Sequence, residues 1–252
     1  MELTITNFLI VCPLVFLAGL TDGIAGGGGL ISLPAYLLAG VPPHMALGTN
    51  KLSSCIGTAA STFRFYKNGY MDMQLGIFSI IFALFGSAIG SSVVLLLDEK
   101  VISHLMIVIL PIVSFYVLRN KNLNNQQVNR QSDRRKDILL ATLISFLIGG
   151  YDGFYGPGTG TFFILAFTGI INLDVKTAAG NSKLVNLASN VAAVTVFLLH
   201  GKVIFLLGIC ASVFSIAGHY FGAGLVINKG VKIVRPIIIV VLVALFIKIV
   251  TG

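Results

Sequence analysis

The stretch that decides the fold is Asp22-Gly-Ile-Ala-Gly-Gly-Gly-Gly29, which lies between two apolar runs. A related stretch, Asp152-Gly-Phe-Tyr-Gly-Pro-Gly-Thr-Gly160, interrupts the second half of the chain in the same way. Glycine lets the backbone turn and lets a ligand approach the main chain closely. Both stretches therefore predict a break in a helix and not its continuation.

The composition around these breaks is that of a membrane protein. The chain has 252 residues, of which 56% are hydrophobic and only 10% are charged, against roughly 25% charged residues in soluble domains. Long apolar runs recur along the whole length, which favours helices over the short alternating strands of a membrane barrel. We predict an all-α polytopic protein of the inner (cytoplasmic) membrane. The net charge of +8 then indicates basic cytoplasmic loops, not a nucleic-acid partner.

At membrane depth, non-helical backbone is tolerated only where it is buried in protein or lines a wet cavity. The helices that follow the breaks, near Leu30 and Thr161, would aim free N–H groups at such a cavity, and this arrangement suits an anion. Close helix packing through small residues is the alternative. The expected loop residues are Gly26, Gly27, Gly28, Gly29, Gly156, Pro157, Gly158, Thr159 and Gly160.

The sequence contains an internal repeat. A shift of 132 residues places Lys51 on Lys183, and a shift of 130 places Asp22 on Asp152. Glycine alone matches by chance in a glycine-rich chain, but Asp and Lys inside apolar segments do not. The first shift also carries one glycine pair onto another, and for these four residues we predict close helix packing. They are Gly86, Gly90, Gly218 and Gly222.

We divide the chain into a first transmembrane repeat (1–118), a basic cytoplasmic linker (119–137) and a second repeat (138–252). The linker combines Lys and Arg with many Asn and Gln residues and cannot bury apolar surface. A full crossing needs about 20 helical residues, so the runs 30–40 and 138–150 are too short. Eight to ten membrane segments result. Ten, or five per half, place more Lys and Arg inside and invert the second repeat, as in many secondary transporters.

Each repeat carries a lysine within an apolar helix, in Gly48-Thr-Asn-Lys-Leu-Ser-Ser54 and in Gly180-Asn-Ser-Lys-Leu-Val-Asn186. An unpaired Lys at mid-bilayer costs at least about 2.5–3.5 kcal/mol, so it must face the interior and have a partner. Two such lysines predict a cationic site near the pseudo-two-fold axis. In the alternative, each Lys forms a structural ion pair with Asp22 or Asp152. The predicted substrate-binding residues are Thr49, Asn50, Lys51, Ser54, Asn181, Lys183, Asn186 and Asn190.

Asp22 and Asp152 are the candidates for coupling or for organising the site. Either could carry a coupling proton, or could hold a Lys or a loop N–H. His219 lies inside an apolar run and is interpreted as a core or cavity residue in preference to a proton relay. The other histidines give no metal-ligand spacing, and no metal or cofactor is expected.

At these residues the chain resembles the sulfite exporter TauE/SafE family. The first half carries Gly26-Gly-Gly-Gly29, Pro34, Gly40-Val-Pro-Pro43, Ala46 and Gly48-Thr49. The second carries Tyr151-Asp-Gly-Phe-Tyr-Gly-Pro-Gly-Thr-Gly160, followed by Asn181, Lys183, Asn186 and Ser189-Asn190, and resembles the branch called "probable membrane transporter". The resemblance implies a permease for small anions such as sulfite, thiosulfate or organosulfonates, coupled to protons.

Three classes of function remain to be weighed. Alternating-access transport of a small anion leads, with protons and the lipid bilayer as the other partners. An intramembrane enzyme is disfavoured because the sequence has neither a GxSG-type serine motif nor HExxH. A passive anion channel or a component of a membrane complex is the alternative. Substrate, direction of transport and oligomeric state stay open.

Overall fold

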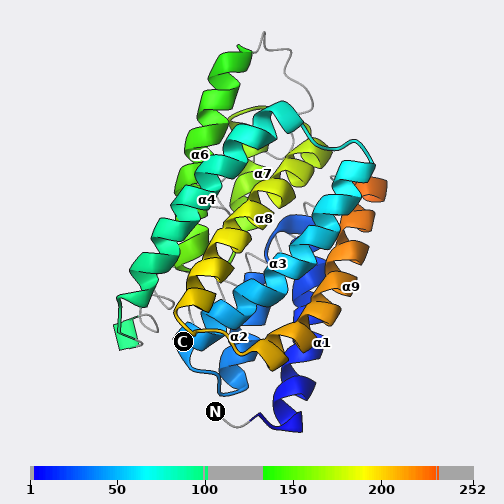
Figure 1. The fold of residues 1–252 in the computed structure, drawn as a ribbon. Coiled ribbons are helices and arrows are strands. Elements are labelled where there is room, and N and C mark those ends of the chain that lie inside the picture. Colours follow the sequence, from blue (N-terminus) through cyan, green and yellow to red (C-terminus); the bar gives the residue numbers. More distant parts are fainter. Residues whose placement is uncertain (1–2, 99, 102–132, 231, 233–252) are drawn as a thin grey trace, which may run out of the picture.

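The computed structural model describes residues 3–98, 100–101, 133–230 and 232, and they are almost entirely helical (Figure 1). The end of the first predicted repeat from residue 102, the linker up to residue 132 and the end of the second repeat from residue 233 lie outside this part. The helices are α1 (Ile5–Ala25), α2 (Gly29–Leu38), α3 (Pro43–Lys67), α4 (Met73–Leu95), α6 (Arg134–Phe154), α7 (Thr159–Gly169), α8 (Val175–Leu199) and α9 (Phe205–Lys229).

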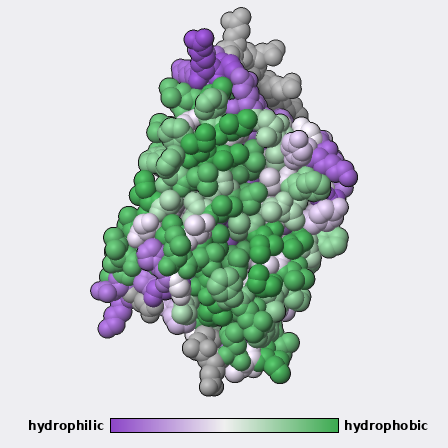
Figure 2. Space-filling model, viewed as in Figure 1, coloured by the Kyte–Doolittle hydropathy of each residue, from purple (hydrophilic) through white to green (hydrophobic). Residues whose placement is uncertain are grey.

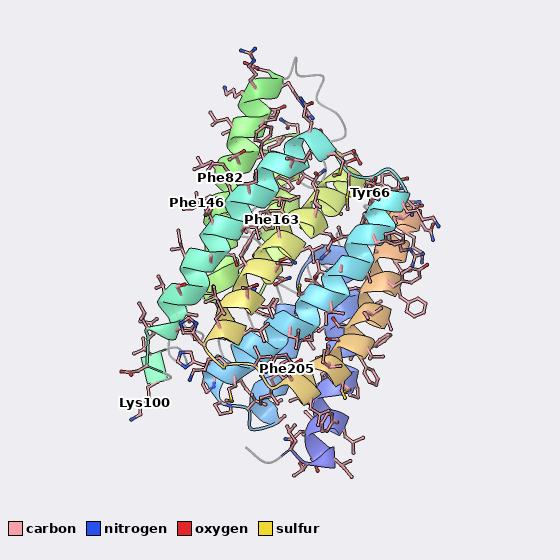
Figure 3. All side chains as sticks on the ribbon, viewed as in Figure 1. Tyr66, Phe82, Lys100, Phe146, Phe163 and Phe205 are labelled. Carbon is pink, nitrogen blue, oxygen red and sulfur yellow. The ribbon has the colours of Figure 1, made fainter. Side chains whose placement is uncertain are left out.

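Five helices in the described part are long and apolar enough to cross a membrane: α1, α4, α6, α8 and α9. With 25 residues α3 matches the longest of them, but Lys51, Arg64 and Lys67 lower its hydropathy. Large apolar side chains cover the outside, and Figure 2 shows hydrophilic residues mainly near the helix ends. Of the residues labelled in Figure 3, Phe82 of α4 and Phe205 of α9 have exposed side chains (43% and 61%), whereas Phe163 of α7 is fully buried. The protein is a multi-pass helical membrane protein.

One prediction about the segments was wrong. The run 138–150 was expected to be too short to cross, but α6 has 21 residues and starts at Arg134. The Asp133 carboxylate caps it by accepting from the Arg135 backbone N–H at 3.1 Å. Three basic residues, Arg134 to Lys136, form its first turn and are exposed. Residues 134–137 therefore belong to a membrane helix and not to the linker.

The helices form two groups that run in opposite directions (Figure 1). The residue numbers at the α1–α9 contact rise together, since Gly19 lies against Ser215 and Gly23 against Ala223. Similar contacts make α3 parallel to α9, and α4 parallel to both α6 and α8. Between α3 and α8 the order reverses, because Lys51 contacts Asn190 whereas Thr62 bonds to the Lys183 carbonyl. Helices α3 and α8, which the predicted repeat places in correspondence, therefore run in opposite directions, the orientation that an inverted repeat predicts.

Glycine allows the closest helix contacts, as predicted. A Cβ added to Gly86 or Gly90 on α4 would lie 2.2 Å or 2.0 Å from a carbonyl oxygen of α6. At Gly218 and Gly222 on α9 the corresponding distances to carbonyl oxygens of α1 are 2.2 Å and 2.4 Å. These values leave no space for a side chain, so the prediction of small-residue packing is confirmed.

Asp72 connects the ends of two helices, and we expect its replacement to have a modest cost. Its carboxylate caps α4 through the Leu75 N–H at 3.2 Å and pairs with Arg134 at 2.6 Å. Asp72→Ala should lower the free energy of unfolding by about 1 kcal/mol, whereas Asp72→Asn keeps the cap and should lower it less. Thermal unfolding in detergent measures both.

The same substitution has a pH signature. The hydrogen bond from Arg134 lowers the pKa of Asp72. The contribution of the ionised Asp72 carboxylate to stability is therefore complete above the ordinary carboxyl pKa. It is lost as the pH falls through the lowered pKa of Asp72 in the folded protein. The difference in melting temperature between wild type and Asp72→Ala should shrink under acidic conditions. A difference that grows there would contradict this assignment.

Candidate functional site

The two glycine-rich breaks meet inside the molecule. The first helix, α1, ends at Ala25, and Gly26 follows with a φ of 82°, its N–H bonding to the Asp22 carbonyl. The second break has left-handed Gly156 and Gly158 before α7 begins at Thr159. A Cβ on Gly26 would lie 2.1 Å from the Gly160 carbonyl carbon. The left-handed turn of one break therefore packs directly on the helix start that follows the other.

Both lysines are buried and each pairs with an aspartate of the other half. Lys51 of α3 lies 2.8 Å from an oxygen of Asp152 on α6, and Lys183 of α8 lies 2.7 Å from Asp22 Oδ2 on α1. The relative exposure of these four residues is between 0% and 8%. Such pairing offsets the cost of burying a charge. The ion pairs named as the alternative therefore exist.

The surroundings of the two aspartates differ. Asp22 Oδ2 also faces His219 Nε2 of α9 at 2.9 Å, and its Oδ1 accepts from the Gly28 N–H at 3.3 Å. Asp152 accepts a short hydrogen bond from the Ser189 hydroxyl of α8. Asp22 thus holds both a lysine and a loop N–H, the two roles considered from the sequence, and has a histidine in addition.

A small polar cavity lies between these groups. Its volume is about 30 Å³, enough for about two water molecules. The starts of α2 and α7 reach its wall through Gly29 and Thr159, as expected for helix N-termini at an anion site. Its other polar lining residues are Asp22, Ser32, Asn50, Lys51, Ser54, Asp152, Asn186, Asn190, Ser215 and His219, with Gly26, Gly28, Gly156 and Gly160.

Most of the predicted binding residues gather at this cavity, and three do not line it. Thr49 Oγ1 accepts from the Ile204 N–H at 3.0 Å at the start of α9. The Asn181 amide bonds to the Thr177 carbonyl of its own helix. Lys183 stands behind Asp22 and reaches the cavity only through that carboxylate. Of the predicted loop residues, Gly27, Pro157 and Gly158 are not in the lining.

Asn50 has a buried, unpaired acceptor at the cavity wall. The residue is 5% exposed, lines the cavity, and its Oδ1 has no hydrogen-bond partner within the described residues. Lys51 has one further partner, Asn190 Oδ1 at 3.2 Å. For the same part of the chain no group of three His, Cys, Asp or Glu side chains is placed to hold a metal ion. The site therefore consists of charged pairs, a histidine, amides, hydroxyls and backbone N–H groups.

Sequence reasoning did not predict the partners that the aspartates have in addition to the lysines. Ser189 and Ser215 were not considered for the site, and His219 was interpreted as a core or cavity residue. The structure makes it a cavity residue in direct contact with Asp22. A helical signal was available, since Ser215 and His219 stand four residues apart on one face of α9.

Comparison with known proteins agrees with this architecture. The family described as Sulfite exporter TauE/SafE matches residues 11–249. The chain belongs to this family. It is 32% identical over 240 residues to a "Probable membrane transporter protein" of Haemophilus influenzae, covering 95% of this chain and 93% of the relative. It is also 33% identical to "Probable membrane transporter protein ORF9" of Sinorhizobium, covering 96% and 90% of the two chains.

A third relative, "Probable membrane transporter protein YfcA" of Escherichia coli K12, is 32% identical over 246 residues, covering 94% of this chain and 90% of its own. No solved structure gives a significant match. Membership of the family makes this chain a membrane transporter, and its multi-pass fold with bacterial relatives places it in the inner membrane. A transporter family is also consistent with the expectation that the protein is not an enzyme.

Proposed function

We propose that the protein is a secondary transporter that moves a small anion across the cytoplasmic membrane by alternating access, coupled to protons. The sulfur-containing anions sulfite, thiosulfate and organosulfonates are the proposed substrates, since the family is described as a sulfite exporter. The observation that carries the proposal is the Lys51–Asp152 pair on the wall of a polar cavity at two broken helices.

Lys51 has the central role in anion binding. The anion competes with the Asp152 carboxylate for the Lys51 ammonium group, while Asn50, Asn186 and the first N–H groups of α2 and α7 bind its remaining oxygens. Anion binding thus opens a contact between the two halves.

The inverted halves offer a way to expose the site on either side. Lys51 belongs to the first half and Asp152 to the second, so the pair connects elements that would rock relative to each other. Breaking one cross-half pair when the anion binds favours a different arrangement of the halves. Binding and reorientation are then one process, as alternating access requires.

Uptake by proteoliposomes tests the proposal. Purified protein should show a saturable rise in melting temperature with at least one of sulfite, sulfate, thiosulfate or sulfoacetate, and simple carboxylates serve as comparison. The same anion trapped inside the vesicles should accelerate entry of the labelled anion, and an inward proton gradient should drive its accumulation. Flux that does not respond to internal anion indicates a channel, and absence of any anion flux contradicts the proposal.

A further inference from the structure

The two Lys–Asp pairs have matching geometry but different chemistry, because only one contains a histidine. Asp22 Oδ2 is shared by Lys183 Nζ at 2.7 Å and His219 Nε2 at 2.9 Å. Around Asp152, the corresponding additional partner is the hydroxyl of Ser189. Within the described chain, therefore, one ion pair is combined with an imidazole and the other is not.

This difference follows from substitutions at corresponding positions of the two repeats. The shift of 132 residues places His219 on Ser87 and Ser189 on Gly57. A Cβ on Gly57 would lie 2.1 Å from Ser215 Oγ and 2.5 Å from His219 Nδ1. A Cβ on Gly19 would lie 2.9 Å from the same ring nitrogen. The imidazole of His219 fits only because α3 has Gly57 and α1 has Gly19 beside it. In the other half the matched position is the smaller Ser87, so Ser189 can replace the glycine of α3.

The position of His219 satisfies both charge states of its ring. Nδ1 lies 2.9 Å from the Ser215 carbonyl oxygen and 3.2 Å from the Ser215 hydroxyl. A charged imidazolium donates from Nδ1 to the carbonyl and from Nε2 to Asp22. In the neutral ring, Nδ1 instead accepts from the hydroxyl while Nε2 still donates to Asp22. Ser215 therefore supplies an acceptor for one state and a donor for the other, so a proton can bind without leaving a buried group unsatisfied.

We propose that His219 is the proton-binding residue of this transporter, and that its protonation is what couples anion movement to the proton gradient. This inference rests on the proposed function. His219, Asp22 and Ser215 all line the cavity, so a proton can reach the ring from water on the side to which the cavity opens. The proton binds to the neutral imidazole and no other bond changes.

The charges around His219 explain the coupling. The ionisable groups that line the cavity with His219 are Asp22 of α1, Lys51 of α3 and Asp152 of α6. Lys183 of α8 pairs with Asp22, and Asp22 makes the direct contact with the ring. With a neutral ring, the two Lys–Asp pairs sum to zero charge. Protonation makes the cavity region +1, which favours the binding of an anion. Proton and anion therefore favour each other's binding, which by linkage is reciprocal, and both move in the same direction.

His219→Gln tests this proposal, with His200→Gln as control because His200 lies exposed at the end of α8. The probe is labelled thiosulfate, whose charge is constant between about pH 5.5 and 8.5, the range in which histidine titrates. In wild type we expect thiosulfate affinity to fall about ten-fold as the pH rises through this range. His219→Gln should still exchange external labelled thiosulfate for thiosulfate trapped inside the vesicles. It should lose the pH dependence of affinity and the accumulation driven by the proton gradient. His200→Gln should behave like wild type.

Two further measurements keep the result decisive. Nitrogen NMR of labelled histidine in detergent should show one resonance, absent from His219→Gln, that titrates near neutral pH and moves to higher pH with thiosulfate. Ser215→Ala removes the donor to the neutral ring and should move the midpoint of pH-dependent exchange upward. A wild-type level of proton-driven accumulation in His219→Gln, or a His219 resonance that does not titrate, overturns the proposal while leaving anion exchange intact. If wild type shows no thiosulfate exchange, the proposed function itself is contradicted.

Discussion

Lys51→Met should reduce anion uptake by about two orders of magnitude, the largest functional effect we expect. The substitution removes the cation that lines the cavity and leaves Asp152 as a buried negative charge beside the path of the anion. A charge-assisted hydrogen bond contributes about 1.5–3 kcal/mol, and an unpaired buried charge costs a further 3–5 kcal/mol. Initial rates in proteoliposomes, normalised to reconstituted protein, measure the loss.

The double variant Lys51→Met/Asp152→Asn separates a substrate-binding role from a structural ion pair. Removing both charges eliminates the unpaired aspartate, so stability should return to within about 1 kcal/mol of wild type. Uptake should stay as low as in the single variant, because no ammonium group remains for the anion. A double variant that recovers both stability and uptake would show that the pair only holds the helices together.

Lys67→Met provides the matched control. Lys67 lies exposed at the end of α3, sixteen positions after Lys51 on the same helix. Its removal changes the net charge by the same amount without touching the cavity or any buried carboxylate. Uptake and melting temperature should both remain close to wild type. A comparable loss in Lys67→Met would mean that the overall charge of the protein, and not the cavity cation, governs uptake.

Helical periodicity in the sequence predicted which helix faces line the cavity better than it predicted each individual lining residue. Lys183, Asn186 and Asn190 share one face of α8, and the two amides do line the cavity. Thr49 and Asn181 each stand two positions before a lysine, about 200° round the helix. Both therefore point away from the cavity, which the same periodicity could have shown. Their polar character alone placed them in the predicted site.

Other features depend on contacts that one sequence does not reveal. The extent of α6 was underestimated because three basic residues form its first turn, where their long side chains can reach the membrane surface. The choice of partner for each lysine depends on how the halves pack, so the sequence left it open. The role of His219 depends on Gly19 and Gly57, which are distant in the chain and make room for the ring. A glycine in the sequence indicates room for a particular side chain only when the residue that packs against it is known.

Gly26→Ala should cause a large loss of stability, because two costs combine at this position. Gly26 has a φ of 82°, which disfavours any side chain, and the new Cβ would lie 2.1 Å from the Gly160 backbone. Left-handed geometry costs about 1–2 kcal/mol and overpacking about 1–3 kcal/mol, so we expect a total loss of about 2–5 kcal/mol. Melting temperature in detergent and the fraction of monodisperse protein measure it.

Two glycines elsewhere separate these costs. Gly69 has a similar φ of 73° but nothing within 4 Å of an added Cβ, so Gly69→Ala should show the conformational cost alone, about 1–2 kcal/mol. Gly160 lies in α7 with ordinary helical backbone, and its added Cβ would lie 2.5 Å from Gly26 Cα. Gly160→Ala should therefore show the contact cost without the conformational one. If Gly26→Ala is no worse than Gly69→Ala, the two breaks do not touch, and a cavity formed jointly by both loops loses its structural basis.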